Sequence, residues 1–90
     1  MTGDDDRIRG LREQLAATDE RIVDAVNERL VLVERLKRVK EEVGLGFLDP
    51  DREAQMHAHL RARNAGPLSA EGLRAFYESL LALTKRELRG

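Results

Sequence analysis

The sequence predicts an all-α protein with three helices per chain, one very long N-terminal helix, and an intertwined helical homodimer. The first observation is composition, because 37 % of the 90 residues are charged and only 3 % are aromatic. Together with abundant Ala, Leu, Glu and Arg, these proportions favour long helices over a sheet. The second observation is that apolar residues recur at intervals of three, four and seven, which is the period of a helix.

The first predicted helix covers about residues 5–43 and follows an apolar stripe. No Pro occurs between Asp5 and Val43, and Gly44 is expected to cap the C-terminal end. The stripe consists of Ile8, Leu11, Leu15, Ile22, Val26, Leu30, Val33, Leu36 and Val39. Such a helix would extend roughly 57 Å, whereas a globule of this size has a radius of gyration of about 12 Å. The rest of the chain cannot cover the stripe, so the same helix of a second protomer is the expected partner.

Two shorter helices are predicted over about residues 50–64 and 70–88. Asp49 and Pro50 form an N-cap followed by Pro at the first helical position, and Ser69 is a suitable N-cap for the third helix. The apolar side chains are Met56 and Leu60, directed inward, on the second helix and Leu73, Phe76, Tyr77, Leu80, Leu81 and Leu88 on the third.

Charge, cysteine content and hydropathy exclude several classes of protein. Residues 1–90 are expected to form one domain, because the chain is short and contains no internal repeat. A formal net charge of −1 argues against a nucleic-acid or membrane partner. The absence of Cys removes disulfides, thiolate nucleophiles and cysteine-based metal sites. No apolar run can span a bilayer and the N-terminus lacks a signal pattern, so we expect a soluble cytoplasmic protein.

Arg29 is the most informative residue, because it is a cation on the apolar stripe. It lies in the same heptad position as Ile22 and Leu36, and a charge there is costly unless an anion meets it. Two interpretations are open: a polar residue that sets register or pairs with a nearby Glu, or a group that binds an anionic ligand. Lys40 shares the face of Arg29, so the two side chains could converge on a small dianion.

Arg12 cannot reach the same ligand within one chain. It precedes Lys40 by roughly 42 Å along a straight helix. A lone Arg near a helix start is usually solvated, and that interpretation stays open beside a second one. In the second interpretation, Arg12 reaches a ligand that is bound by an antiparallel partner chain.

The second predicted helix opens with a cluster of charges. Asp49 is explained as its N-cap, whereas Arg52 opposes the helix dipole, which suggests a binding role. His57 and His59 lie two residues apart, point to different faces and are predicted to be surface residues. No Ser-His-Asp arrangement and no phosphate-binding Gly loop can be assembled from the sequence.

Charged residues also recur in a fixed order along the first two helices. The segments are Leu11-Arg12-Glu13, Asp19, Glu28-Arg29, Lys40 and Asp49-Pro50-Asp51-Arg52-Glu53. In order and spacing they resemble the all-helical (AroQ) class of chorismate mutases. The segment Asn64-Ala65-Gly66-Pro67 is also similar to mutase domains fused to, or partnered with, 3-deoxy-heptulosonate-phosphate (DAHP) synthases.

The resemblance implies an isomerase that converts chorismate to prephenate for Phe and Tyr biosynthesis, without a metal or cofactor. The residues that it assigns to the two carboxylates of chorismate are Arg29 and Lys40 of one protomer and Arg12 of the other. Lys40 also donates toward the ether oxygen. Glu53, supported near Asp49, receives the ring hydroxyl, and Arg52 closes the carboxylate side.

This chemistry requires few kinds of residue. The rearrangement is intramolecular, so the enzyme restrains the flexible enolpyruvyl arm in its reactive pose. It also places cations where negative charge grows on the breaking ether oxygen. A dianion therefore calls for two or three fixed Arg or Lys side chains, and the planar fork of Arg binds both oxygens of a carboxylate.

The third helix departs from the family pattern. Thr84 stands where the family usually has Ser, and Leu88 stands where it places a Gln or Glu that binds the ether oxygen. Either the helix shifts to present Glu87, or the site lacks that donor, whose loss typically lowers the rate by ~10²–10³. A slow mutase is therefore expected, or one completed by a partner such as a DAHP synthase.

Other functions stay open on the same residues. The cations would also serve an isochorismate pyruvate-lyase or an aminodeoxychorismate mutase of the same fold. A non-catalytic helical dimerisation or regulatory module is a further alternative. In that module, Arg29 and Lys40 would merely pair with Glu34, Glu41 or Glu42.

Overall fold

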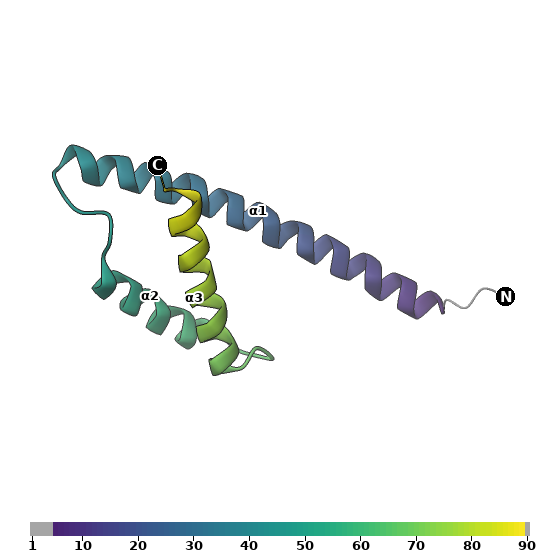
Figure 1. Ribbon diagram of the computed structural model, residues 1–90. Coiled ribbons are helices and arrows are strands. Elements are labelled where there is room, and N and C mark those ends of the chain that lie inside the picture. The colour runs from purple at the N-terminus through teal and green to yellow at the C-terminus, as the bar shows by residue number, and fades with distance from the viewer. Residues whose placement is uncertain (1–4, 90) are drawn as a thin grey trace. The chain divides into compact units, whose positions relative to one another are not determined.

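The computed structural model describes residues 5–89, which form three helices and no strand (Figure 1). The helices are α1 (Asp6–Glu42), α2 (Pro50–Arg63) and α3 (Ala70–Glu87). The all-α class predicted from composition and apolar spacing is confirmed. The ranges predicted from the sequence are about 5–43, 50–64 and 70–88.

The chain divides into two compact units, residues 1–32 and residues 33–90. The first unit contains the N-terminal turns of α1. The second contains the last turns of α1 together with α2 and α3. None of the helices within residues 5–89 has the length and apolar character needed to cross a membrane.

Both ends of α1 are closed by local hydrogen bonds. The Oδ1 atom of Asp5 accepts a hydrogen bond from the Arg7 main-chain N–H at 2.8 Å. The Arg7 side chain, followed by its main-chain N–H, lowers the pKa of the Asp5 carboxyl. At the other end, Gly44 has a φ of +78°, and the Leu45 N–H donates to the Lys40 carbonyl at 2.7 Å. Because glycine adopts a positive φ without steric cost, the predicted cap at Gly44 is confirmed.

Most of the apolar stripe of the first unit is exposed in the single chain, although Val26 and Leu30 are half-buried. No residue of α1 is buried. Side chains of the predicted stripe that are 45 % to 62 % exposed are Ile8, Leu11, Leu15 and Ile22. Apolar surface left in water contributes nothing to the hydrophobic stabilisation of the fold. Intrinsic propensity alone gives an isolated helix only marginal stability, and these exposed turns of α1 gain little from packing within the single chain.

In the second unit, side-chain caps fix where α2 and α3 begin. Asp49 Oδ1 accepts a hydrogen bond from the Arg52 N–H at 3.1 Å, and Ser69 Oγ accepts one from the Gly72 N–H at 2.9 Å. Each satisfies an N–H group that has no partner within its own helix. The N-caps predicted at Asp49 and Ser69 are therefore confirmed.

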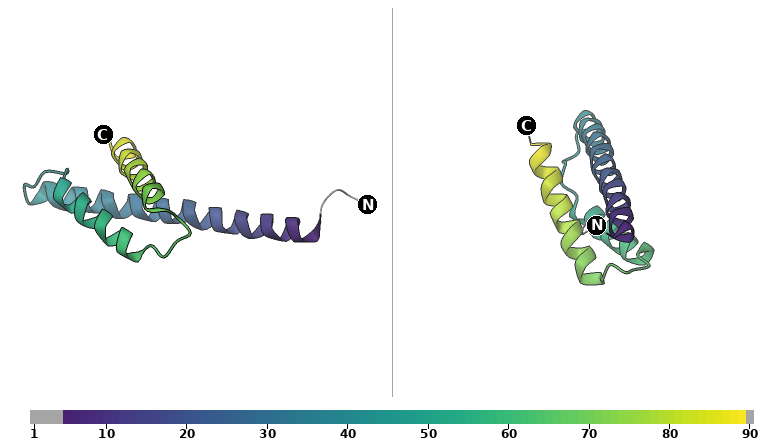
Figure 2. Two further views of the ribbon diagram at one scale, coloured as in Figure 1. Left: turned by 90° about the horizontal axis from the view of Figure 1, so that it is seen from below. Right: turned by 90° about the vertical axis from the view of Figure 1, so that its right-hand side faces the viewer.

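The apolar packing of this unit lies where α2 and α3 contact each other (Figure 2). Leu73 and Tyr77 of α3 are buried, and each is 6 % exposed. Met56 and Leu60 of α2 are half-buried. Phe76 belongs to the same predicted apolar set but is 52 % exposed, because successive residues of a helix point about 100° apart.

The prediction that His57 is a surface residue is wrong. Its ring is stacked on Tyr77, with the ring centroids 6.1 Å apart and the planes inclined by 17°. Its Nε2 atom is buried and has no hydrogen-bond partner among the described residues. Because His57 is polar, its residue type did not indicate that it faces inward. It lies four residues after Glu53 on α2, and both residues are half-buried. His59 is exposed, as predicted.

Candidate active site

Lys40 lies in the last turn of α1 and is held by the loop that follows. Its Nζ donates a hydrogen bond to the main-chain oxygen of Phe47 at 3.2 Å, and the residue is half-buried. An ammonium group has three donors, so one bond to the loop orients the side chain without using all of them. Glu34, offered as a partner in the non-catalytic alternative, pairs with Arg38 at 2.8 Å.

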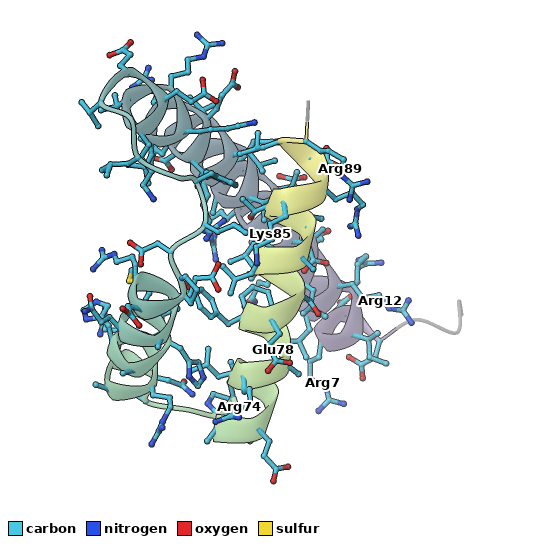
Figure 3. All side chains as sticks on the ribbon, turned by 60° about the vertical axis from the view of Figure 1, so that its left-hand side comes forward. Arg7, Arg12, Arg74, Glu78, Lys85 and Arg89 are labelled. Carbon is cyan, nitrogen blue, oxygen red and sulfur yellow. The ribbon has the colours of Figure 1, made fainter. Side chains whose placement is uncertain are left out.

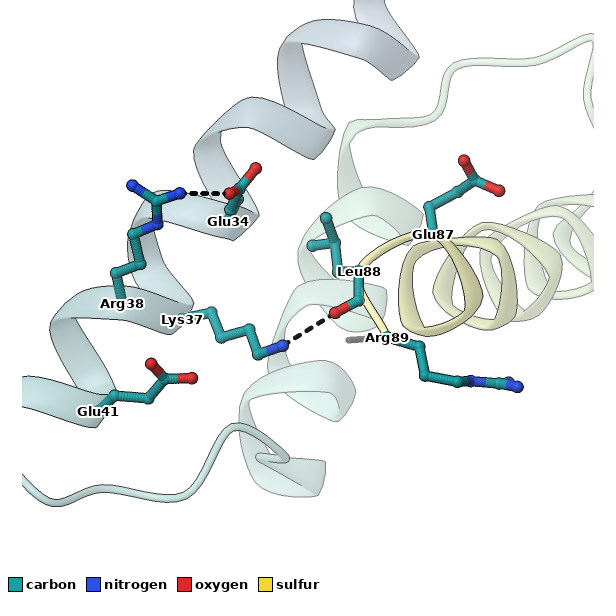
Figure 4. Close-up of a pocket in the computed structure, with 7 residues that line it drawn as sticks. All are labelled: Glu34, Lys37, Arg38, Glu41, Glu87, Leu88 and Arg89. Atoms are coloured by element: carbon teal, nitrogen blue, oxygen red, sulfur yellow. Dashed lines mark hydrogen bonds and ion pairs between the residues drawn. The ribbon is translucent and has the colours of Figure 1, made fainter.

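Lys37, which was not predicted as a site residue, connects three parts of the second unit. Its Nζ donates to the main-chain oxygen of Leu88 at 2.8 Å (Figure 4). The same atom lies 5.7 Å from the centroid of the Phe47 ring, within the range of a cation–π interaction. The end of α1, the loop after it and the end of α3 therefore meet at one ammonium group. Its position three residues before Lys40, on the same side of a helix, is the signal that could have identified it.

Glu53 of α2 forms an ion pair with Lys85 of α3. The distance from Lys85 Nζ to Glu53 Oε1 is 3.4 Å, and the side chains are 46 % (Lys85) and 32 % (Glu53) exposed. Lys85 projects from α3 on the side toward α2 (Figure 3). A role at the site was predicted for Glu53 but not for Lys85. Its spacing of four residues from Leu81 and three from Leu88 already places it on the apolar face of α3.

Glu53 also borders a cavity of about 260 Å³ between α2 and α3. The remaining lining residues are Pro50, Ala54, His57, Arg74, Tyr77, Glu78 and Leu81. A second depression of about 350 Å³ lies beside Lys37 and Leu88 (Figure 4). Its charged lining residues are Glu34, Lys37, Arg38, Glu41, Glu87 and Arg89.

Asp49 and Arg52 lie at the exposed start of α2. The carboxylate of Asp49 accepts the Arg52 N–H, and its main-chain oxygen accepts the Glu53 N–H at 3.0 Å. Asp49 therefore fixes the first turn from which the Arg52 and Glu53 side chains project. Its support of Glu53 acts through the backbone of this turn.

The end of α3 contains the three other residues assigned to the substrate. Thr84 is 4 % exposed, and its hydroxyl donates to the Leu80 carbonyl at 2.7 Å. Leu88 is the C-cap residue, and its N–H donates to the Thr84 carbonyl. Glu87 is exposed, and its carboxylate points away from Lys37 (Figure 4). This turn thus presents a main-chain oxygen to Lys37, and not the carboxylate of Glu87.

Arg12 and Arg29 lie on α1 in the first unit, where Arg12 is exposed and Arg29 is half-buried. The second unit contains the cations Lys37, Lys40 and Lys85 and the carboxylate of Glu53. Fixed ammonium groups can hold an anion and stabilise charge that develops on an oxygen. Among residues 5–89, no group of three His, Cys, Asp or Glu side chains could hold a metal ion.

Comparison with known proteins identifies the family. The model of the family described as chorismate mutase type II matches residues 11–88. The chain belongs to the chorismate mutase type II family. The resemblance seen in the order of charged residues is therefore confirmed, and the matched range includes all nine residues assigned to the substrate.

Two solved chorismate mutase structures from Thermus thermophilus are similar to this chain. Form I is 33 % identical, with a TM-score of 0.84, over 87 % of this chain and 98 % of that chain. Form II is 32 % identical, with a TM-score of 0.86, over 92 % of this chain and 97 % of that chain. The family likeness thus extends to the three-dimensional fold.

Curated relatives are bifunctional chorismate mutase/prephenate dehydratases. The protein from Stutzerimonas stutzeri is 31 % identical over 86 % of this chain, and that from Pseudomonas aeruginosa is 29 % identical over 88 %. This chain spans only 22 % and 23 % of their respective lengths. Their names pair the mutase with a prephenate dehydratase, whereas a DAHP synthase partner stays a prediction.

Proposed function

We propose that this chain catalyses the rearrangement of chorismate to prephenate. The observation that supports it best is the chorismate mutase type II match over residues 11–88. The match contains, at unbroken spacing, the cations at Arg12, Arg29 and Lys40 and the pair Arg52-Glu53. A reaction without a nucleophile or cofactor requires little more than such groups held in place.

In this proposal each group contacts a stated part of the substrate. Arg29 and Lys40 bind the carboxylates, and Lys40 donates toward the ether oxygen as negative charge grows there. Glu53 accepts a hydrogen bond from the ring hydroxyl, and Arg52 closes the carboxylate side. Substrate-binding contributions from Thr84, Glu87 and Leu88 belong to the same proposal, at the end of α3. The hydrogen bond from Lys40 to the Phe47 carbonyl supports its task, because it restrains a flexible side chain before substrate arrives.

We further propose that the working form is an intertwined homodimer. In this dimer, Arg12 of one protomer reaches the substrate site of its partner. The exposed apolar stripe of α1 supports the dimer, because a second copy of the same helix would bury it. The placement of Arg12 near the start of a 37-residue helix that ends just after Lys40 supports its action across the dimer. Analytical ultracentrifugation should give twice the mass of the 10.2 kDa chain.

The loss of chorismate, followed by ultraviolet absorbance, tests the activity directly. The product from chorismate should be prephenate, whereas release of pyruvate from isochorismate would indicate the lyase alternative. Arg29→Ala should abolish turnover, because a carboxylate of the substrate would lose its bidentate partner. Its helical circular dichroism should be almost unchanged. If Arg29→Ala keeps its activity and changes only the oligomeric state, Arg29 is a structural residue.

We propose that a DAHP synthase partner completes the site, which lacks a hydrogen-bond donor to the ether oxygen at Leu88. The kcat of the chain alone should be lower than that of a mutase with this donor. The expected factor is ~10²–10³, which is the typical effect of losing one oxyanion donor. Adding a DAHP synthase from the same organism should raise kcat, whereas adding serum albumin should not. A high turnover number for the chain alone that the synthase leaves unchanged would contradict this expectation.

A further inference from the structure

The ion pair between Glu53 and Lys85 is loose and partly open to solvent. Its distance of 3.4 Å exceeds the 2.7–2.9 Å typical of a charge-assisted hydrogen bond. Both side chains keep about a third or more of their surface exposed, at 32 % for Glu53 and 46 % for Lys85. Solvent weakens such a pair. A polar group of a ligand can therefore enter between the two charges without breaking a tight contact.

A hydroxyl group matches this pair on both sides. A hydroxyl donates one hydrogen bond and accepts others, whereas a carboxylate only accepts and an ammonium only donates. One ligand hydroxyl can thus donate to Glu53 while accepting from Lys85. The proposed function already assigns the ring hydroxyl of the substrate to Glu53. Lys85 is the cation that pairs with that carboxylate at 3.4 Å.

We propose that Lys85 is a specificity-determining residue that selects a ring hydroxyl over a ring amine. This inference rests on the proposed function and adds a choice of substrate to it. A protonated amine in place of the hydroxyl would still donate to Glu53, but it offers no lone pair to Lys85. It would instead bring a second positive charge against the ammonium group, which disfavours binding.

The charge of Glu53 alone would give the opposite preference. Without Lys85, a carboxylate attracts an ammonium group more strongly than a neutral hydroxyl. Lys85 on α3 therefore reverses the preference for an amine that Glu53 on α2 would have by itself. This difference separates a chorismate mutase from an aminodeoxychorismate mutase of the same fold, because their substrates differ in this group.

The test measures kcat/KM for chorismate and for 4-amino-4-deoxychorismate with the same enzyme preparations. Wild-type enzyme should prefer chorismate. Lys85→Met, which keeps the apolar stem and removes the charge, should shift the ratio of the two kcat/KM values toward the amine by about tenfold, the order expected for one partly screened charge contact. Lys85→Arg should keep the wild-type ratio. Arg86→Met removes one positive charge from the neighbouring, exposed position and should also leave the ratio unchanged.

A second background separates selectivity from folding. In Glu53→Gln enzyme, the further change Lys85→Met should shift the ratio much less, because the carboxylate that attracts the amine has gone. Thermal denaturation identifies unfolded variants, and Lys85→Gln replaces Lys85→Met if the latter does not fold. An unchanged ratio in a folded, active Lys85 variant would overturn the inference alone. Wild-type enzyme that does not convert chorismate would overturn the proposed function and this inference with it.

Discussion

At the scale of single residues, three lysines of the second unit are each oriented by a hydrogen bond or an ion pair. Lys37 bonds to the Leu88 carbonyl, Lys40 bonds to the Phe47 carbonyl, and Lys85 pairs with Glu53. Lysine side chains lose considerable rotamer entropy when they are ordered. A contact made before the ligand binds removes part of that cost from binding. The three ammonium groups are therefore oriented before any ligand binds, mostly by main-chain oxygens.

His57 offers a prediction at the same scale. Its buried Nε2 has no hydrogen-bond partner among the described residues, and an unsatisfied buried polar atom is destabilising. His57→Phe should keep the stacking on Tyr77 and raise the free energy of unfolding by about 1 kcal/mol. Chemical denaturation of the two proteins measures the difference.

His59→Phe is the matched control for that substitution, because His59 is exposed on the same helix. Its free energy of unfolding should stay within about 0.5 kcal/mol of wild type. A His57→Phe protein that is less stable than wild type would show that the imidazole makes a stabilising hydrogen bond.

At the scale of helices, the residues assigned to the substrate in the second unit lie at helix ends. Lys40 lies in the last turn of α1, Arg52 and Glu53 in the first turns of α2, and Thr84 in the last turns of α3. The loops and caps that fix these ends consequently fix the site. Asp49 is such a cap, although the family resemblance also places it beside Glu53 in the substrate site.

Substitutions of Asp49 distinguish these two roles. Asp49→Ala removes the acceptor for the Arg52 N–H and should lower the free energy of unfolding by about 1 kcal/mol. Asp49→Ser keeps a capping oxygen without the charge and should retain both stability and kcat/KM. Denaturant titration and the chorismate assay measure the two quantities. If Asp49→Ser is stable but loses activity, the carboxylate acts beyond the cap.

At the scale of the whole molecule, the single chain exposes more large apolar side chains than it buries. Leu73 and Tyr77 are its only buried apolar residues within 5–89, while fourteen large apolar side chains in that range are exposed. Such a small core is not expected to stabilise a chain of 90 residues by itself. The proposed homodimer accounts for both observations, because each protomer would cover the other.

Mixed dimers test whether Arg12 acts across the interface. Arg12→Ala and Arg29→Ala should each be inactive alone. Co-expressed, they should form mixed dimers in which one site has both arginines, so that the mixture regains about a quarter of wild-type activity if dimers form at random. Differently tagged chains and the chorismate assay measure this recovery. No recovery in proven mixed dimers would place both arginines in sites of one chain.

Local patterns in the sequence were sufficient to predict the helices and their caps. The caps at Gly44, Asp49 and Ser69 involve hydrogen bonds between residues at most five positions apart, so neighbouring residue types determine them. The order of the charged residues was likewise sufficient to identify the chorismate mutase family, because it is a property of spacing along the chain.

Only the tertiary structure decided which side chains meet between helices. The stacking of His57 on Tyr77, the pairing of Glu53 with Lys85 and the bond from Lys37 to Leu88 join residues 20 to 51 positions apart. Such contacts depend on the rotation of each helix about its own axis. That rotation is determined by packing against the neighbouring helix, and a periodic pattern within one helix leaves it open.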